Sequence, residues 1–390
     1  MKIVVLGGAG LQGRAALQDL GRNEAVTKIV CADMAFEALD EFSDYLAMEK
    51  IVKQKVDATS QENLAEIFSD NVDAVIDLLP VRFNETSARA AIETGVPLVN
   101  SSYASGLSEE VFRKAKEKRV AIMPESGLDP GIDLVLCGYA VSQLDEVYEL
   151  YSYCGGVPEP EAANNPIKYK ISWNFDMVLR TLKRPSRMKI DGELVDIPAQ
   201  DQHNSEWIKE ISVAGVEGLE SMPNGDAVKF AKLLGIADEV VTTERRTIRW
   251  KGHAKFWRDM VGLGFLEEEA VPGFQGISPH DFLVKHLEPR LQYKGNEKDL
   301  TIMKNVIRGK KDGKKMEIIY ELIDERDLES GLFAMNRTVG YTASIVAQML
   351  ADGTIEKKGV LSPTIDIPYQ KFIEEVSERG IKINEIIKVK

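Results

Sequence analysis

The sequence predicts an α/β protein, in which a doubly wound parallel sheet is followed by an α+β domain with a mostly antiparallel, open sheet. Three observations support this prediction. A glycine-rich turn joins the first strand to the first helix, strands and helices alternate over the first third of the chain, and longer strands with few helices between them follow.

The chain begins with a nucleotide-binding pattern. The apolar run Lys2–Leu6 is typical of a buried strand, and Gly8, Gly10 and Gly13 follow it with G-x-G-x-x-G spacing before a helical pattern. Gly8 permits a tight turn, Gly10 lets the backbone approach a pyrophosphate, and Gly13 lets the helix pack closely. Since a helix N-terminus offers unpaired N–H groups to phosphates, the pattern predicts a dinucleotide site.

The residue that follows the second strand predicts which dinucleotide is bound. That strand, Lys28–Ala32, ends at Asp33, roughly 20 residues after the glycines. A carboxylate at this position accepts hydrogen bonds from the adenosine ribose and repels a 2′-phosphate. We therefore expect NAD as the cofactor, in preference to NADP.

Regular alternation continues to residue 123. Further strands are expected at Ile51–Val56, Asp73–Leu79, Pro97–Asn100 and Arg119–Met123, and helices at Gln61–Phe68, Asn84–Thr94 and Ser108–Lys118. Ligands of such sheets lie beyond the carboxyl ends of the strands. The expected cofactor-binding residues are Gly8, Gly10, Leu11, Gln12, Gly13, Asp33, Asp57, Leu79 and Pro80.

The pattern changes at a crossing loop, residues 125–133. Beyond it, strands are expected at Tyr148–Cys154, Tyr169–Trp173, Ile208–Val213, Thr242–Trp250, Leu300–Arg308 and Lys315–Leu322. Small residues at Gly340, Ala343 and Ala347 let the apolar helix Leu332–Leu350 approach a neighbour closely, so we expect it to pack on the first domain. The expected domains are 1–128 with 332–390, which bind the dinucleotide, and 129–331, which bind the substrate.

Composition favours a small-molecule enzyme. The 390 residues carry a net charge of −13, which argues against nucleic acid and anionic membranes as partners, and no apolar stretch approaches the length of a membrane span. The cysteines Cys31, Cys137 and Cys154 are far apart and form no metal pattern with the four histidines. We therefore expect a cytoplasmic protein without a metal, and base rates for enzymes favour a homodimer.

Several segments resemble the saccharopine dehydrogenase family of the glutamate-forming type. They are ESGLDPGID (125–133), SYCGGVPEPEAANNPIKYKISW (152–173), NSSYASG (100–106), MPNGDAVKFAKLLGI (222–236), RTIRWKGH (246–253) and FAMNRTVGYTASIVAQMLADG (333–353). FNETSARAAIETGV (83–96) is similar to the lysine 6-dehydrogenases of the same family. The resemblance implies a Rossmann domain completed by the C-terminal helix, and a cleft between it and a substrate domain.

The resemblance also implies a reaction in lysine metabolism and amino-acid biosynthesis: NAD-dependent oxidation of a CH–NH group, which cleaves saccharopine to aminoadipate semialdehyde and glutamate. Family residues that line the cleft match Tyr103, Asp129 and Cys154 here. We take these three as catalytic candidates, and Tyr103, Lys170 and Asn224 as candidates for binding the amino-acid substrate.

The residues by themselves leave each role open. Oxidation of an amine needs a proton acceptor and a proton donor near the nitrogen, and Asp129 at the domain junction suits this role. An aspartate before proline is also ordinary turn chemistry. Cys154 can be a small buried apolar residue, Tyr103 a half-buried aromatic, and Lys170 part of a solvated strand face shared with Lys168.

One departure from the family leaves the substrate open. The arginine that family members carry in P-N-x-D, where it meets a substrate carboxylate, is Gly225 here. Compensating cations are available nearby at Lys229, Arg245, Arg246 and Arg249. Lysine 6-dehydrogenases lack the aspartate of G-L-D-P-G, which is present as Asp129. The alternatives are therefore a lysine 6-dehydrogenase, which deaminates the lysine side chain, or a non-catalytic NAD-binding protein.

Overall fold

The computed structural model describes residues 1–273 and 276–389. The chain divides into two compact units. The first unit combines Met1–Tyr139 with Asp327–Ile381, and the second combines Ala140–Arg326 with the chain from Lys382 onward. The expected domains divide at 128/129 and 331/332 instead. Asp129 therefore lies in the unit of the glycine-rich turn, and not in the substrate domain where the sequence analysis placed it.

The first unit contains a parallel sheet with the strand order β15-β6-β5-β4-β1-β2-β3. In this order the chain adds β2 and β3 on one side of β1, then returns to its other side to add β4, β5 and β6. This is the strand order of a Rossmann fold, and it confirms the predicted α/β class. The strands are β1 (Lys2–Leu6), β2 (Lys28–Asp33), β3 (Ile51–Lys55), β4 (Ala74–Asp77), β5 (Leu98–Asn100), β6 (Ala121–Met123) and β15 (Gly359–Val360).

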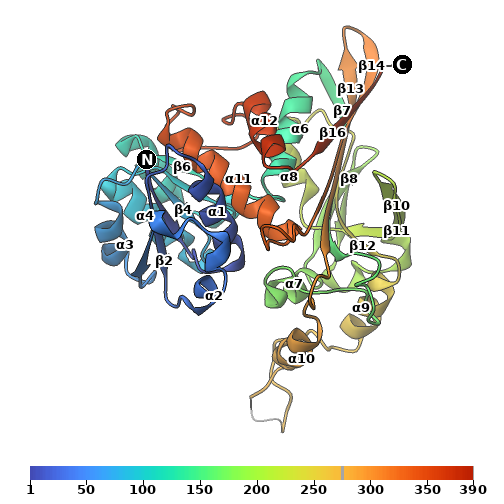
Figure 1. Cartoon of the computed structure of the whole chain (residues 1–390). Helices are drawn as coiled ribbons and strands as arrows, with labels where there is room; N and C mark the ends of the chain where they lie inside the picture. Colours follow the sequence, from blue (N-terminus) through green and yellow to red (C-terminus); the bar gives the residue numbers. More distant parts are fainter. Residues whose placement is uncertain (274–275, 390) are drawn as a thin grey trace. The chain divides into compact units, whose positions relative to one another are not determined.

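Helices cover both faces of this sheet (Figure 1). The helices of this unit are α1 (Leu11–Arg22), α2 (Glu37–Asp40), α3 (Gln61–Phe68), α4 (Asn84–Thr94), α5 (Glu109–Lys118), α11 (Ala334–Ala351) and α12 (Tyr369–Glu378), and α6 (Ile132–Ser142) begins in this unit and ends in the second. Ser60 and Ser108 cap α3 and α5 by accepting bonds from the backbone N–H of Asn63 and Val111. Gly95 ends α4 with φ +76°, where glycine costs least.

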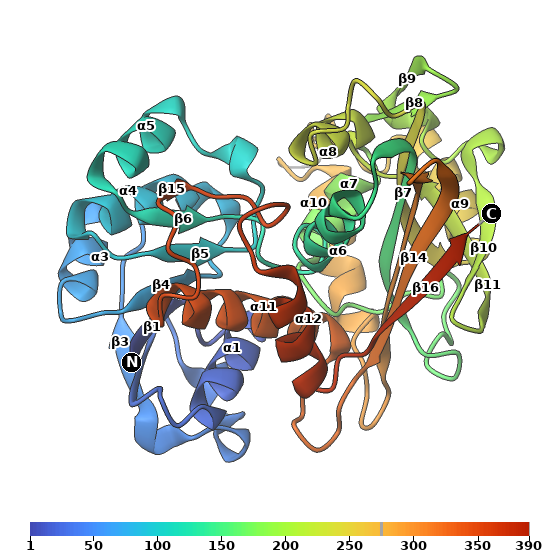
Figure 2. The same ribbon diagram turned by 90° about the horizontal axis from the view of Figure 1, so that it is seen from above.

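The helix α11 packs along α1 inside the first unit (Figure 2). A Cβ at Gly340 would lie 2.4 Å from the carbonyl oxygen of Gln12, so only glycine permits this approach. Polar bonds fix the pair, because the Ser344 hydroxyl donates to Asp19 at 2.6 Å and the Tyr341 hydroxyl donates to Gln18 at 2.8 Å. The small residues of α11 predicted this contact.

The second unit contains a mixed sheet with the strand order β10-β11-β12-β7-β13-β14-β16, to which β8 and β9 are added beside β12. The pair β7 and β12 is parallel and the other described pairs are antiparallel. The strands are β7 (Glu146–Pro158), β8 (Ser186–Ile190), β9 (Glu193–Ile197), β10 (Lys209–Val213), β11 (Val216–Pro223), β12 (Thr242–Trp250), β13 (Asp299–Lys311), β14 (Lys314–Glu325) and β16 (Ile383–Val389).

Four helices belong wholly to the second unit. They are α7 (Phe175–Thr181), α8 (Ala227–Leu233), α9 (His253–Gly262) and α10 (Pro279–Leu287). Apolar side chains of α7, α9 and α10 form one core cluster, which includes Phe175, Trp257 and Leu283. This cluster also contains Tyr169, so it anchors the segment that leads from β7 into α7.

Three local predictions for this unit are wrong. The segment Tyr169–Trp173 is a loop, because its apolar side chains pack singly into the helical cluster and its backbone pairs with no strand among the described residues. Lys168 takes φ +47° and is exposed, whereas Lys170 is buried, so the two lysines do not share a face. In addition, Cys154 lies inside β7, which continues to Pro158, and not at a strand end.

Gly340→Ala is expected to destabilise the first unit by about 1–3 kcal/mol, because the added methyl overpacks the contact between α11 and α1. Chemical denaturation followed by circular dichroism measures this loss. Gly106→Ala is the matched control, since no atom lies within 4 Å of its added Cβ. Equal stability of the two variants would show that the close approach of α11 contributes nothing.

Candidate functional site

The glycine-rich turn has the geometry of a phosphate cradle. The Gly7 N–H donates to Ala32 on β2 at 2.9 Å, and the Gly10 N–H donates back to Gly7 at 3.1 Å, which closes the turn. Gly10 is the N-cap of α1 and supplies no side-chain cap, so the N–H groups of the first helical turn point out without a side-chain acceptor. This arrangement suits an anionic ligand at the helix N-terminus.

Two glycines of the turn are required by close packing. A Cβ at Gly13 would lie 2.2 Å from the Gly7 carbonyl oxygen, and one at Gly8 would lie 2.7 Å from the Cys31 sulfur. Both distances are far below van der Waals contact, so any side chain here would push α1 away from the sheet. The structure therefore gives Gly13 the role in helix packing that its spacing predicts, whereas the positive φ of the turn lies at Gly7 and Gly8 is limited by its contact with Cys31.

Asp33 bonds to the turn itself. One carboxylate oxygen accepts from the Ala9 N–H at 3.0 Å, and the other accepts from the Met34 N–H at 2.7 Å. On the neighbouring strand, Lys55 is the register partner of Asp33 and is exposed, and Lys53 forms an ion pair with Asp40. The carboxylate thus has backbone donors of its own and lies beside a strand that carries two cations.

The other predicted cofactor-binding residues lie at the same edge of the sheet. Leu79 and Pro80 follow β4, and a Cβ at Gly7 would lie 2.9 Å from the neighbouring Leu78 carbonyl oxygen, so this loop borders the turn. Asp57 follows β3, where its carboxylate accepts from the hydroxyl of Thr59 at 2.6 Å. That bond lowers the pKa of Asp57 and gives it a turn-forming role.

Asp77 is a titratable group at this edge that the sequence analysis did not select. It ends β4, is buried, and accepts from the Leu79 N–H at 3.1 Å. Burial raises its pKa to about 6, because desolvation disfavours the carboxylate. An aspartate that ends a strand of apolar residues and precedes a proline loop is the only sequence signal for it.

Tyr103 and Asp129 belong to two loops of the first unit that are joined by backbone bonds. The Glu125 N–H donates to the Ser102 carbonyl at 2.9 Å, and the Ser126 N–H donates to Asn100 at 2.8 Å. Asp129 is half-buried, and its peptide bond with Pro130 is cis. These bonds place the two catalytic candidates on neighbouring loops beyond β5 and β6.

In the second unit, Cys154 lies in a row of residues that crosses three strands. Its register partner on β12 is Thr247, whose partner on β11 is Met222. Arg245 and Arg249 lie two residues on either side of Thr247, so they share its face of the sheet. Cys154 is therefore flanked on one face by two arginines.

Arg249 is a buried cation with no carboxylate partner among the described residues. Its Nη1 donates to the Ile248 carbonyl at 2.8 Å, and its Nε is buried with no hydrogen-bond partner in the described chain. Its register partner Glu220 instead accepts from the N–H groups of Gly252 and Ala254 at the start of α9. Burial lowers the pKa of Arg249, and an anionic ligand would relieve this cost.

The side chains near Arg249 include the buried rings of Tyr169 and His253. Its guanidinium lies 5.5 Å from the centre of the Tyr169 ring, and that ring lies 5.9 Å from the ring of His253. The Nδ1–H of His253 donates to the Ile167 carbonyl at 3.1 Å, while its Nε2 is buried without a partner in the described chain. Burial, reinforced by Arg249, lowers the pKa of His253 to about 3, so the ring is neutral near pH 7.

The two remaining substrate candidates have internal partners. Lys170 is buried and forms an ion pair with Glu297 at 2.5 Å, so its charge is already balanced. Asn224 donates through its N–H to the Arg245 carbonyl at 2.9 Å, and its side-chain oxygen accepts from Arg184. Asn224 therefore lies beside Arg245 of β12, while the ion pair of Lys170 fixes the loop that contains it.

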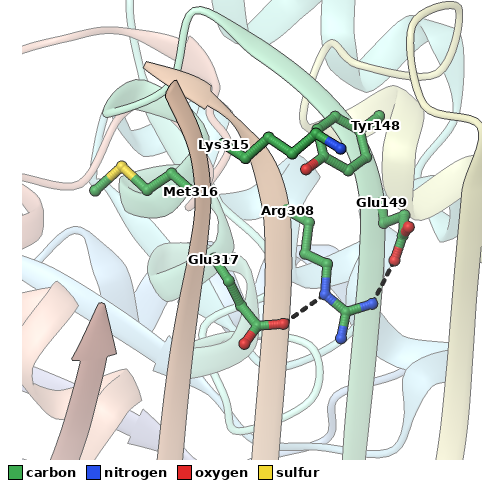
Figure 3. Close-up of a pocket in the computed structure, with 6 residues that line it drawn as sticks. All are labelled: Tyr148, Glu149, Arg308, Lys315, Met316 and Glu317. Atoms are coloured by element: carbon green, nitrogen blue, oxygen red, sulfur yellow. Dashed lines mark hydrogen bonds and ion pairs between the residues drawn. The ribbon is translucent and has the colours of Figure 1, made fainter. Parts of the chain in front are cut away.

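A surface depression on the same sheet contains an arginine that is paired with two carboxylates. It is lined by Tyr148, Glu149, Arg308, Lys315, Met316 and Glu317. Figure 3 shows Arg308 between two carboxylates, and its ion pairs with Glu149 and Glu317 are both 2.5 Å long. Since the carboxylates already neutralise this guanidinium, the network is a structural clamp between β7, β13 and β14.

Residues 3–124 match the family model of the saccharopine dehydrogenase NADP binding domain, and residues 127–381 match that of the saccharopine dehydrogenase C-terminal domain. The chain is 27% identical to the mitochondrial alpha-aminoadipic semialdehyde synthase of Mus musculus, over 98% of this chain and 47% of that protein. It therefore spans about half the length of this relative.

The saccharopine dehydrogenase [NADP(+), L-glutamate-forming] of Saccharomyces cerevisiae is also 27% identical, over 98% of this chain and 99% of that protein. The solved apo structure of the yeast L-Glu-forming saccharopine dehydrogenase superposes with a TM-score of 0.86 at 24% identity, covering 99% of both chains. This likeness shows that the fold of the two units is that of the yeast protein.

The prediction that Asp33 makes NAD the preferred cofactor is wrong. Residues 3–124 match an NADP binding domain, and the yeast relative is NADP(+)-dependent by name. The physical reason lies in the bonds of Asp33, whose oxygens accept from Ala9 and Met34 and are thereby committed to the turn. A carboxylate after the second strand thus does not by itself predict which dinucleotide is bound.

No helix within residues 1–273 and 276–389 combines the length and apolar character needed to cross a membrane. Over the same ranges, His, Cys, Asp and Glu side chains form no group of three that could hold a metal ion.

Asp77→Asn is expected to change the pH dependence of stability. The folded pKa of about 6 lies above the ordinary value of 3.8, so between these values only the folded state holds the proton and stability falls as pH rises. The amide does not titrate, so it avoids this loss. From pH 3.5 to pH 7, the free energy of unfolding of the variant should rise by about 2–3 kcal/mol relative to that of the parent.

Denaturant titrations at the two pH values measure this difference. Asp70→Asn is a control whose stability should change with pH in the opposite direction. The bond between Asp70 and Lys2 lowers the pKa of that exposed carboxyl, so the asparagine variant should lose stability relative to the parent as pH rises. A parallel pH profile for the Asp77 variant and the parent would contradict the assignment.

Proposed function

We propose a function for this chain from the premise that it belongs to the saccharopine dehydrogenase family. The proposed reaction is oxidation of saccharopine at its CH–NH group by NADP(+), which gives an imine and NADPH; water then hydrolyses the imine to aminoadipate semialdehyde and glutamate. The observation that carries the proposal is Arg249, a buried guanidinium beside Cys154 that no described carboxylate neutralises. A carboxylate of the substrate would satisfy it.

The cofactor proposal rests on the fit of the first unit. NADP would lie on the turn Gly8–Gly13 with its pyrophosphate against the N–H groups of Leu11 and Gln12, where glycines leave the space that a Cβ would fill. Bound there, it supplies the hydride acceptor. Lys55, exposed beside Asp33, is the cation proposed to meet the 2′-phosphate.

Asp129 is the proposed proton-transfer group. An amine must lose a proton when it is oxidised, and hydrolysis of the product requires a proton to be moved again. The carboxyl of Asp129 is half-buried on a loop that hydrogen bonds fix beside the Tyr103 loop. Tyr103 is proposed to orient the substrate through its phenol, and Cys154 to line the site beside Arg249.

A turnover assay tests the proposal. Saccharopine and lysine are each supplied with NADP and with NAD, and reduced cofactor, glutamate and ammonia are measured. We expect saccharopine with NADP to be the best pair, and glutamate to appear in step with NADPH. Formation of ammonia from lysine, without cleavage of saccharopine, would refute the proposed substrate.

Gly225 favours a second candidate function. Since this glycine stands where saccharopine dehydrogenases of the family carry a carboxylate-binding arginine, the chain has one side-chain cation fewer in that motif. A lysine 6-dehydrogenase, whose substrate has a single carboxylate, would tolerate this loss. The same assay separates the two candidates by whether glutamate or ammonia is released.

We also propose a location and an assembly state for the chain. The three cysteines are buried and form no disulfide among the described residues, which suits a reducing compartment such as the cytoplasm. A homodimer is proposed from the frequency of twofold oligomers among enzymes. Sedimentation of the purified chain tests the oligomeric state.

Asp129→Asn is expected to lower kcat for the best substrate by about 10²-fold or more, because the amide keeps the shape and removes the proton acceptor. NADP affinity should stay unchanged, since Asp129 lies outside the glycine-rich turn. Cys154→Ser is the milder comparison and should lose less activity, because a hydroxyl is nearly isosteric with the thiol. Full turnover by the Asp129 variant would make Asp129 a turn residue and reassign proton transfer to water or Tyr103.

A further inference from the structure

The turn between β11 and α8 contains the glycine that departs from the family pattern, and another arginine lies over it. Gly225 has φ +64°, and a Cβ built on it would lie 3.2 Å from Nη2 and 3.4 Å from Cζ of Arg184. The Gly225 carbonyl also accepts from the Arg187 N–H at 2.9 Å, which ties the turn to the start of β8. The space beside residue 225 is thus occupied by the guanidinium of Arg184.

Arg184 differs from the arginines before and after it. Arg180 forms ion pairs with Asp176 and Glu268, and Arg187 forms one with Asp196. Arg184 donates through Nη2 to the neutral side chain of Asn224, and its Nε is buried without an acceptor in the described chain. No carboxylate of the described residues neutralises it, so it has donors and charge available for an anion.

Arg184 is linked through Asn224 to the β12 segment that contains Thr247, the register partner of Cys154. Its partner Asn224 bonds to the Arg245 backbone, and Arg249 lies four residues further along β12. At 3.3 Å per residue, Arg245 and Arg249 are about 13 Å apart along β12. Thr247, the register partner of Cys154, lies midway between them. Arg184 is thus linked through Asn224 to one end of the β12 segment Arg245–Arg249, and Arg249 forms its other end.

We infer that Arg184 binds a second carboxylate of the substrate, and that it replaces the side chain missing at Gly225. This inference rests on the proposed function, because it assigns the far end of a saccharopine-like substrate. Glycine suits position 225 in this arrangement, because its φ is +64° and a Cβ there would lie 3.2 Å from Nη2 of Arg184. Selection of substrates with carboxylates at both ends, over those with one, depends on Arg184.

Arg184→Gln tests the inference by direct binding. Calorimetric titration with saccharopine, without cofactor, should show the dissociation constant raised by about tenfold or more, as expected for loss of a charge-assisted bond. Titration with lysine, which has a single carboxylate, should change by less than about twofold. Arg184→Lys, which keeps the charge and loses the planar fork, should fall between the parent and the glutamine variant.

Arg180→Gln is the matched control, since Arg180 lies one helical turn earlier and is already paired. It should bind both ligands like the parent. Unchanged saccharopine binding in Arg184→Gln, or an equal loss for saccharopine and lysine, would overturn the inference. Failure of the parent to turn over saccharopine would refute the proposed function instead, and the titration would still report whether Arg184 holds a carboxylate.

Discussion

The buried charge of Arg249 is the constraint around which the second unit is organised. A guanidinium removed from water is costly unless an anion or several acceptors meet it. Here Glu220, its register partner, is used to cap α9, and the guanidinium has a backbone carbonyl and the face of Tyr169. By contrast, the buried cation Lys170 has Glu297 at 2.5 Å. The fold thus balances one buried cation and leaves the other without a described carboxylate, which is the basis of the proposal that Arg249 meets a ligand.

The space around Arg249 explains the local sequence. A Cβ at Gly155 would lie 2.2 Å from the Ile248 carbonyl and 3.1 Å from Arg249 Nη1, so the glycine after Cys154 is required by the approach of β12 to β7. The first unit follows the same rule, since Gly13 lets α1 pack closely against the turn after β1 and Gly340 lets α11 pack closely against α1. In both units, glycines bring backbones together where a ligand is proposed to bind.

Local chemistry explains which parts could be predicted from the sequence. The strands and helices of the first third were predictable because buried apolar runs end at serine caps and a C-terminal glycine. The loop 169–173 was mistaken for a strand, since its aromatic residues enter a helical core one by one. Only tertiary structure shows that Arg184 covers Gly225, 41 positions away, or that Asp33 is bound by the turn. The cofactor prediction failed for that last reason.

The most direct test of the account is a crystal structure of the chain with saccharopine bound. The account predicts one substrate carboxylate within hydrogen-bond distance of Arg249 Nε and another against Arg184. A structure in which the ligand carboxylates meet other residues, while water alone satisfies Arg249, would contradict it.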